Sequence, residues 1–251
     1  MQRYFIELSY KGTNFHGWQS QSNAVSVQDV LENAISLKLS EKIGLTGAGR
    51  TDTGVHASYY VAHFDSMHEK LDMNVKFLTG LNRFLPMDIA VSRIRKVRND
   101  VHSRFDAVSR TYKYYISQCK NPFHTETAWY IHSPLNIDRM KKYAVILMEY
   151  DDFGSFCKLH SDNKTNICKI MHAGWTEEKG MLVFTITADR FLRNMVRAIV
   201  GTLVDAGKEK IDEAGFRKII KACDRKKAGT SAPAQGLFLT DIEYPGEVYE
   251  L

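Results

Sequence analysis

The sequence has no run of apolar residues long enough to cross a membrane. A membrane-spanning helix needs ~20 consecutive apolar residues, and no segment of the 251 residues approaches that length. The N-terminal MQRYFIELSY carries Arg3 and Glu7 and lacks the apolar run of a signal peptide. We therefore expect a protein of the cytoplasm.

Cysteine is scarce, and its spacing fits neither a zinc site nor a disulfide framework. No pair of cysteines forms a C-x-x-C motif, and no histidine-rich spacing accompanies them. A zinc deaminase is excluded too, because H-x-E with P-C-x-x-C is absent. We interpret all four as reduced, mostly structural thiols: Cys119, Cys157, Cys168 and Cys223.

Nucleotide-binding motifs are missing as well. The segment GAGRTD (47–52) contains G-x-G without a third glycine and runs into an expected strand rather than a helix. There is no G-K-[ST] motif, so binding of a dinucleotide or a nucleoside triphosphate is not supported.

An excess of positive charge is present but modest. Lys and Arg total 34 against 29 acidic residues, for a net charge of +5. Any one basic cluster would ordinarily be the solvated face of a helix or strand, but four together favour an anionic partner. The clusters occupy residues 92–98, 109–113, 189–197 and 224–227.

Hydrophobic periodicity predicts two similar halves of strands and helices. Residues 3–10 alternate as a half-buried strand would, and Ser26 with Asp29 marks the start of a helix over 27–40. Gly207 is the expected C′ residue of the helix over 190–207. The other expected strands are 43–49, 58–64, 89–97, 109–117, a hairpin over 165–189 and 236–244; the other expected helices are 72–86, 136–150 and about 212–222.

This order of elements predicts the α+β class. Each half follows β-α-β-β-α-β, as in ferredoxin-like and RRM-like folds, with mixed or antiparallel sheets. We expect an N-terminal domain over 1–105, a C-terminal domain over 106–251, and an active-site cleft between the two sheets.

Asp52 is the main candidate for chemistry. It lies in the turn GAGRTDTGVHA (47–57), whose glycines Gly47, Gly49 and Gly54 permit positive φ and close approach of a ligand. An aspartate in such a turn can also simply bond its own backbone. His56 and His63 have no partner at triad or metal spacing, so an ordinary structural or surface histidine is expected at each.

Five segments in order resemble the tRNA pseudouridine synthases of the TruA type. The strongest is GAGRTDTGVHA, in which the family's aspartate is catalytic. One departure is Thr53, where the family more often has alanine, so the geometry of the loop or the rate can differ slightly. The other four are YKGTNFHGWQSQ (10–21), RFDAVSRTYKYYI (104–116), RFLRNMVRAIVGTL (190–203) and APAQGLFLTDIEYP (232–245).

The resemblance implies conversion of uridine to pseudouridine at positions 38 to 40 of the tRNA anticodon stem-loop, without a cofactor. The C1′–N1 bond breaks, the uracil turns, C5 bonds to C1′, and the C5 proton leaves. Asp52 can act as a nucleophile toward C1′ or C6, or as the base of an elimination through a glycal. The residues do not distinguish these routes.

The resemblance also implies catalytic roles for Arg197 and Tyr112. A charged Asp52 in a closed pocket needs a cation, which the family's motif assigns to Arg197; periodicity alone would make it a solvated helix arginine. Tyr112 would stack on the flipped uracil and take part in proton transfer, although alternation alone favours a strand aromatic packed in the sheet.

RNA contacts are expected from Arg50, Lys113 and Arg193. The target uridine must be flipped out of its stem, and Arg50 can fill the gap or hold a phosphate, unless it is a turn arginine paired with a local carboxylate. Lys113, Arg193 and the DRKK segment (224–227) are weaker candidates for phosphate contacts. The resemblance further implies a homodimer.

Two other classes of protein compete with the enzyme. The first is a non-catalytic RNA-binding module of RRM-like fold. The predicted strands lack the aromatic RNP1 pattern of such modules, and this function would give Asp52 no role. A small-molecule enzyme of ferredoxin-like fold would have no cofactor motif and no use for the basic clusters.

Overall fold

The computed structural model describes residues 1–158 and 164–249, which form two compact units. Unit 1 contains Met1–Val108 and the C-terminal residues from Leu239, and unit 2 contains Ser109–Phe238. The expected C-terminal domain, 106–251, differs from unit 2 because the chain's last strand ends in unit 1. No helix in the described ranges is long and apolar enough to cross a membrane.

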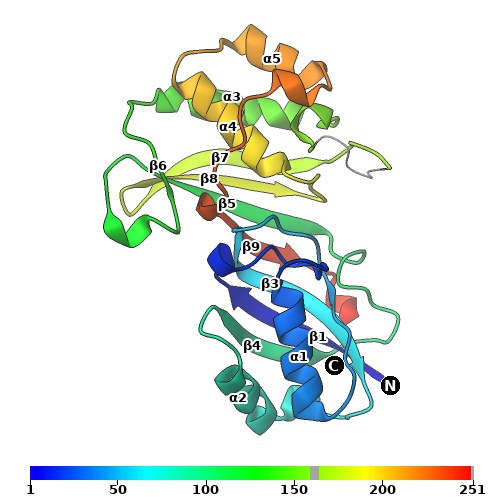
Figure 1. The fold of residues 1–251 in the computed structure, drawn as a ribbon. Helices are drawn as coiled ribbons and strands as arrows, with labels where there is room; N and C mark the ends of the chain where they lie inside the picture. The colour runs from blue at the N-terminus through cyan, green and yellow to red at the C-terminus, as the bar shows by residue number, and fades with distance from the viewer. Residues whose placement is uncertain (159–163, 250–251) are drawn as a thin grey trace. The chain divides into compact units, whose positions relative to one another are not determined.

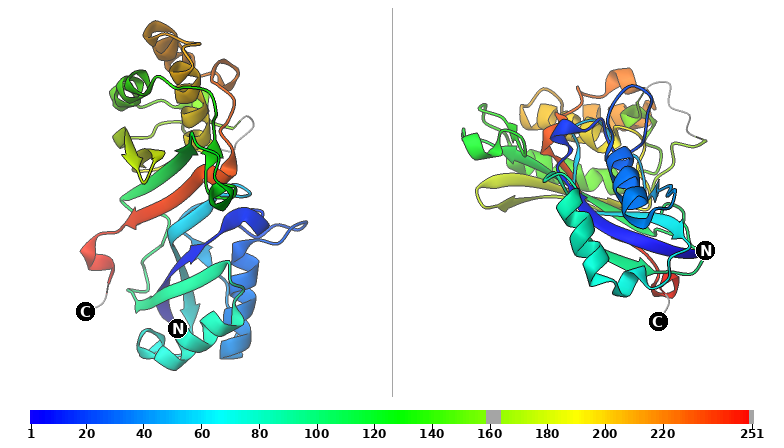
Figure 2. Two further views of the ribbon diagram at one scale, coloured as in Figure 1. Left: turned by 90° about the vertical axis from the view of Figure 1, so that its left-hand side faces the viewer. Right: turned by 60° about the horizontal axis from the view of Figure 1, so that its bottom comes forward.

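Unit 1 is a sheet in the order β4-β1-β3-β9, with β1 antiparallel to both β3 and β4. Its helices α1 and α2 contact each other and lie on one face of the sheet (Figures 1 and 2). The elements are β1 (Gln2–Tyr10), α1 (Val27–Leu39), β2 (Thr46–Gly47), β3 (His56–Ser66), α2 (Val75–Phe84), β4 (Ile89–Lys96) and β9 (Leu237–Glu243).

The prediction of a half-buried first strand is wrong. Successive residues from Tyr4 to Leu8 are all buried, because β1 lies between two strands and both faces of the sheet are covered. The C-terminal turn lies on the face opposite the helices (Figure 2, left). There the ring of Phe5 packs on Tyr244 and Tyr249, with ring centroids 4.9 and 6.2 Å apart.

Unit 2 is a mixed sheet covered by three helices. Strands β5, β8 and β7 are antiparallel neighbours, and β6 pairs with β5 in parallel. Helix α3 packs on both β7 and α4, and the helices gather on one face (Figure 1). The elements are β5 (Ser109–Ser117), β6 (Trp129–Tyr130), α3 (Ile137–Ile146), β7 (Ile170–Glu178), β8 (Met181–Ala188), α4 (Met195–Gly207) and α5 (Glu213–Lys221). The α+β prediction is therefore confirmed.

Some predicted ends of helices and strands agree with the structure, and others differ from it. The capping box of Ser26 and Asp29 forms as predicted. The helix expected from Asp72 instead begins at Val75, because the Asn74 side chain caps it by accepting from Phe77 N at 2.9 Å. The strand expected over 43–49 is shortened to two residues.

The fourth helix also differs from the prediction at both ends. It begins at Met195 rather than 190, because Asn194 has φ 66° and a left-handed residue cannot continue a helix. Gly207 is the last helical residue and not a C′ glycine; the positive φ falls at Glu209. Gly207 instead allows close packing, since a Cβ there would lie 2.5 Å from Met140 Sδ.

Candidate active site

The turn that carries Asp52 is held against the loop that follows β1. Thr51 Oγ1 accepts from Trp18 N at 3.0 Å and is hydrogen-bonded to the Tyr10 hydroxyl at 2.9 Å. On the other side of the aspartate, Gly54 N donates to Phe15 O at 3.3 Å. Two of the resembling segments, 10–21 and 47–57, thus form one structure, and the residues on either side of Asp52 are held in place.

A glycine of the first loop, as well as glycines of the turn, allows this close contact. Gly17 has φ +85°, and a Cβ there would lie 2.2 Å from Thr51 O. In the turn itself only Gly54 has a positive φ. A Cβ added at Gly49 would meet no atom within 4 Å, so the packing does not require glycine at this position.

An aromatic floor supports the strand that enters the turn. The rings of Trp18 and Tyr60 are stacked with centroids 4.1 Å apart, and Tyr10 meets Tyr60 edge-on at 5.7 Å. The Tyr60 hydroxyl donates to Gly49 O. A Cβ at Gly47 would lie 2.2 Å from the same hydroxyl. The backbone from Gly47 to Thr51 therefore rests on rigid rings, while Asp52 itself is half-buried at the turn.

The neighbours of Asp52 on the turn differ in their surroundings. Arg50 is exposed, and its guanidinium forms no ion pair with any described residue. The alternative of a turn arginine neutralised by a local carboxylate therefore finds no support. Thr53 is also exposed, so this departure from the family's pattern alters the surface of the turn and not its packing.

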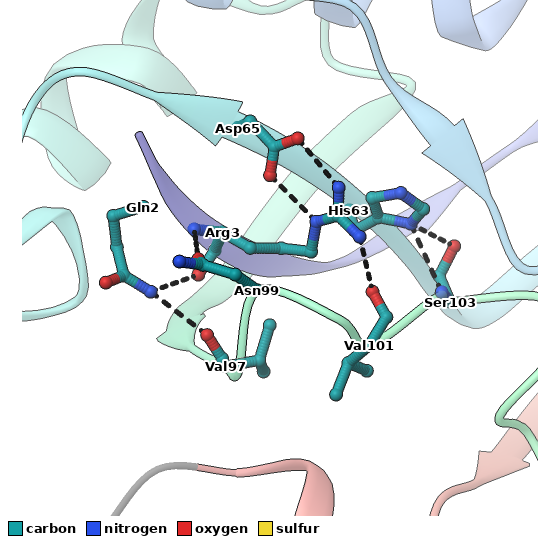
Figure 3. A network of polar contacts seen from close by, with 8 residues as sticks. All are labelled: Gln2, Arg3, His63, Asp65, Val97, Asn99, Val101 and Ser103. Atoms are coloured by element: carbon teal, nitrogen blue, oxygen red, sulfur yellow. Dashed lines mark hydrogen bonds and ion pairs between the residues drawn. The ribbon is translucent and has the colours of Figure 1, made fainter.

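Both histidines near the turn are structural, as predicted. His56 is buried, and its Nδ1 accepts from Gly12 N at 2.9 Å. His63 is buried on β3, and its Nδ1 accepts from Ser103 N at 3.1 Å (Figure 3). Burial lowers the pKa of His63 to about 4. Within 1–158 and 164–249, no group of three or more His, Cys, Asp or Glu residues is placed to hold a metal ion.

Tyr112 lies in unit 2, half-buried on β5 opposite Ile186. Its ring meets Phe191 edge-on, with centroids 5.0 Å apart at 85°. The sequence analysis assigned no role to Phe191, although it lies in the resembling segment 190–203 beside the basic residues that precede α4. The fully buried tyrosine of this strand is Tyr114, which donates to Pro233 O at 2.8 Å.

Arg197 is held by the segment that precedes β9. Its Nε donates to Ala232 O at 2.8 Å, and its own carbonyl accepts from Ala232 N at 2.9 Å. One turn further along α4, a Cβ at Gly201 would lie 1.8 Å from Thr230 O. Arg197 and Gly201 thus share the face of α4 that packs on 230–232, and the arginine is half-buried and oriented rather than freely solvated.

The weaker candidates for phosphate contact are not equivalent. Lys113 forms an ion pair with Glu178 at 2.9 Å, so a phosphate would have to compete with that carboxylate. This hydrogen bond also lowers the pKa of Glu178. Arg193 is exposed. In the DRKK segment, Arg225 donates to Gly229 O and Ser231 Oγ, and the exposed side chains are Lys226 and Lys227.

Known proteins resemble the chain over its whole length. A family model described as tRNA pseudouridine synthase matches residues 8–106 and 150–245. A protein of Bacteroides fragilis named tRNA pseudouridine synthase A is 55% identical over 251 residues, which cover 100% of this chain and 99% of that protein. Proteins of the same name from Parabacteroides distasonis and a Thermoanaerobacter species are 51% and 42% identical and span at least 97% of both chains. With Asp52 in the matched turn and relatives this similar over their full lengths, the chain belongs to the tRNA pseudouridine synthase family.

Proposed function

We propose that this chain is an isomerase that converts uridine to pseudouridine at positions 38 to 40 of the tRNA anticodon stem-loop. The observation that supports this most directly is the turn at Asp52, whose flanking residues are hydrogen-bonded to a rigid loop while the carboxylate stays half-buried. A reacting carboxylate must be positioned in this way, since misplacement by 1 Å can cost ~10²-fold in rate.

In the proposed reaction Asp52 is the central group. It attacks C1′ or C6 of the flipped uridine, or removes a proton to begin elimination. The C1′–N1 bond breaks, the uracil turns, C5 bonds to C1′ and any bond to Asp52 breaks, and N1 gains a proton while C5 loses one. Substrate and product have the same atoms and oxidation state, so the reaction needs no cofactor.

The other proposed catalytic groups come from unit 2. Arg197, oriented by Ala232, supplies the positive charge that keeps Asp52 ionised. Tyr112 stacks on the uracil and its hydroxyl moves a proton, with Phe191 limiting the motion of the ring. The N-terminal half thus contributes the nucleophile or base, and the C-terminal half contributes the groups that hold the base and balance the charge.

RNA binding is proposed for the exposed basic side chains. Arg50 occupies the place of the flipped nucleotide or holds its phosphate, and Arg193 contacts phosphate elsewhere. Lys113 does so only where RNA displaces Glu178. We further propose that the protein works as a homodimer in the cytoplasm.

The test is release of tritium from tRNA labelled at uracil C5. Asp52→Asn is expected to abolish release with nearly unchanged tRNA affinity, because the amide keeps the shape but not the charge, and affinity comes from Lys and Arg. Asp72→Asn, at an exposed carboxylate of the same unit, is the control and should release tritium normally. Turnover of Asp52→Asn within about tenfold of normal would make Asp52 only a turn residue. Binding without release by the unmodified chain would instead favour the non-catalytic RNA-binding module.

A further inference from the structure

A row of aromatic rings leads from the interior of unit 1 to its surface. The His63 ring, 6% exposed, meets His102 with centroids 4.8 Å apart, and His102 meets Phe105 at 4.3 Å. The Arg104 guanidinium lies 5.6 Å from the centroid of Phe105. Phe105 is 74% exposed. The outer end of the row therefore presents an aromatic ring and a cation to solvent.

Polar contacts hold the backbone beneath this row (Figure 3). Arg3 of β1 pairs with both carboxylate oxygens of Asp65 at 2.7 Å and donates to Val101 O at 2.9 Å. Ser103 N donates to His63 at 3.1 Å. The residues immediately before Phe105 are thus tied to two strands of the sheet, so the exposed ring belongs to a rigid segment.

The turn after Ser103 is closed by its own side chains. Asp106 Oδ2 accepts from His102 N at 2.6 Å, and His102 Nδ1 accepts from Arg104 N at 3.1 Å. Burial and the nearby Arg3 lower the pKa of His102, although Asp106 opposes this effect. His102 is therefore a neutral ring at pH 7, suited to stacking, and the carboxylate of Asp106 already accepts a backbone hydrogen bond.

The same segment is tied to the strand that enters the Asp52 turn. Ser103 Oγ donates to Thr46 O at 2.7 Å, and Thr46 begins β2, which leads directly into 47–57. A substrate held at Phe105 is therefore held by the structure that positions Asp52.

We propose that Phe105, with His102 behind it and Arg104 beside it, is a stacking platform for an unpaired base of the RNA substrate. A rigid exposed ring stacks on any base at little entropic cost, and an adjacent guanidinium stacks or contacts the neighbouring phosphate. The charge of Arg104 complements a polyanion and disfavours an apolar protein partner. This proposal rests on the proposed function, since tRNA is the occupant.

The experiment measures tRNA affinity and its salt dependence with full-length variants. Phe105→Ala is expected to weaken binding about 5- to 150-fold, as the loss of one stacked base predicts, without changing the slope of log Kd against log salt. Phe105→Trp should keep the affinity. Arg104→Gln should reduce that slope by about 0.7 to 0.9, the value of one phosphate contact. The control is Phe84→Ala, which removes another exposed ring of unit 1, 52% exposed on α2, and should bind tRNA normally.

The outcomes separate this proposal from the proposed function. Tritium release by the unmodified chain together with unchanged affinity in Phe105→Ala would overturn the platform and leave the function standing. Affinity that depends on Phe105 without tritium release would support the platform and overturn the function. Equal weakening by Phe84→Ala, or a changed sedimentation coefficient in Phe105→Ala alone, would overturn the platform in favour of general destabilisation or a protein contact.

Discussion

Gly17→Ala is expected to slow catalysis although residue 17 offers no chemical group. A Cβ at this position would lie 2.2 Å from Thr51 O, and ordinary contact begins near 3.4 Å. The peptide that joins Thr51 to Asp52 must therefore move by about 1.2 Å, since the stacked rings of Trp18 and Tyr60 leave the loop of Gly17 little freedom to yield. Misplacement of this size costs ~10²-fold in rate.

The mutation also carries a conformational cost that must be separated from the displacement. Residue 17 has φ +85°, and alanine in the left-handed region costs about 1–2 kcal/mol. Gly180 is the matched control: it has φ +76° in the β7–β8 turn, and a Cβ added there would meet nothing within 4 Å. Gly180→Ala should therefore carry a similar backbone cost without the clash, and so lose less stability than Gly17→Ala while keeping its activity.

The assay is single-turnover tritium release at saturating enzyme, combined with tRNA affinity and thermal unfolding. For Gly17→Ala we expect a rate about 10²-fold lower, unchanged affinity, and a loss of stability greater than that of Gly180→Ala. A normal rate in a folded Gly17→Ala protein would refute the argument that the first loop positions Asp52.

Four further predictions can be tested in the same way. Tyr112→Phe should slow the single-turnover rate by ~10²–10⁴-fold if the hydroxyl moves a proton; a normal rate would reduce Tyr112 to a stacking surface. Burial lowers the pKa of His63 from 6.5 to about 4, so the unfolded state binds this proton more tightly. The free energy of unfolding should therefore fall by roughly 3 kcal/mol as the pH is lowered between those values. In denaturant titrations, His63→Gln should reduce this dependence of stability on pH, and an unchanged dependence would contradict the buried, neutral state of His63. If about six phosphates are neutralised, the logarithm of tRNA affinity should fall with the logarithm of salt concentration at a slope of roughly −4 to −5, and a flat slope would contradict this. Sedimentation should show a dimer, and a monomer at micromolar concentration would contradict that expectation.

Much of the fold could be predicted from local patterns, and the candidate site residues were proposed from motifs that resemble the family's. The capping box at Ser26 acts over three residues, and the strand 109–117 has the predicted bounds because alternation is a local property. Asp52 could be proposed as the reacting carboxylate because its motif, and the order of the resembling segments along the chain, can be read from the sequence without knowing how the chain packs.

Tertiary structure alone decided which glycines, rings and strand faces matter. Gly17 contacts a turn more than thirty residues away, so no local pattern could distinguish it from the permissive Gly49. The first strand is buried on both faces because the C-terminal segment returns to cover Phe5. Nothing in the local sequence marks Phe105 as exposed, and the contacts that Arg3 and Ser103 make with other parts of the chain hold its segment at the surface. Each of these features depends on residues far apart in the chain, and such contacts leave no periodicity in the sequence.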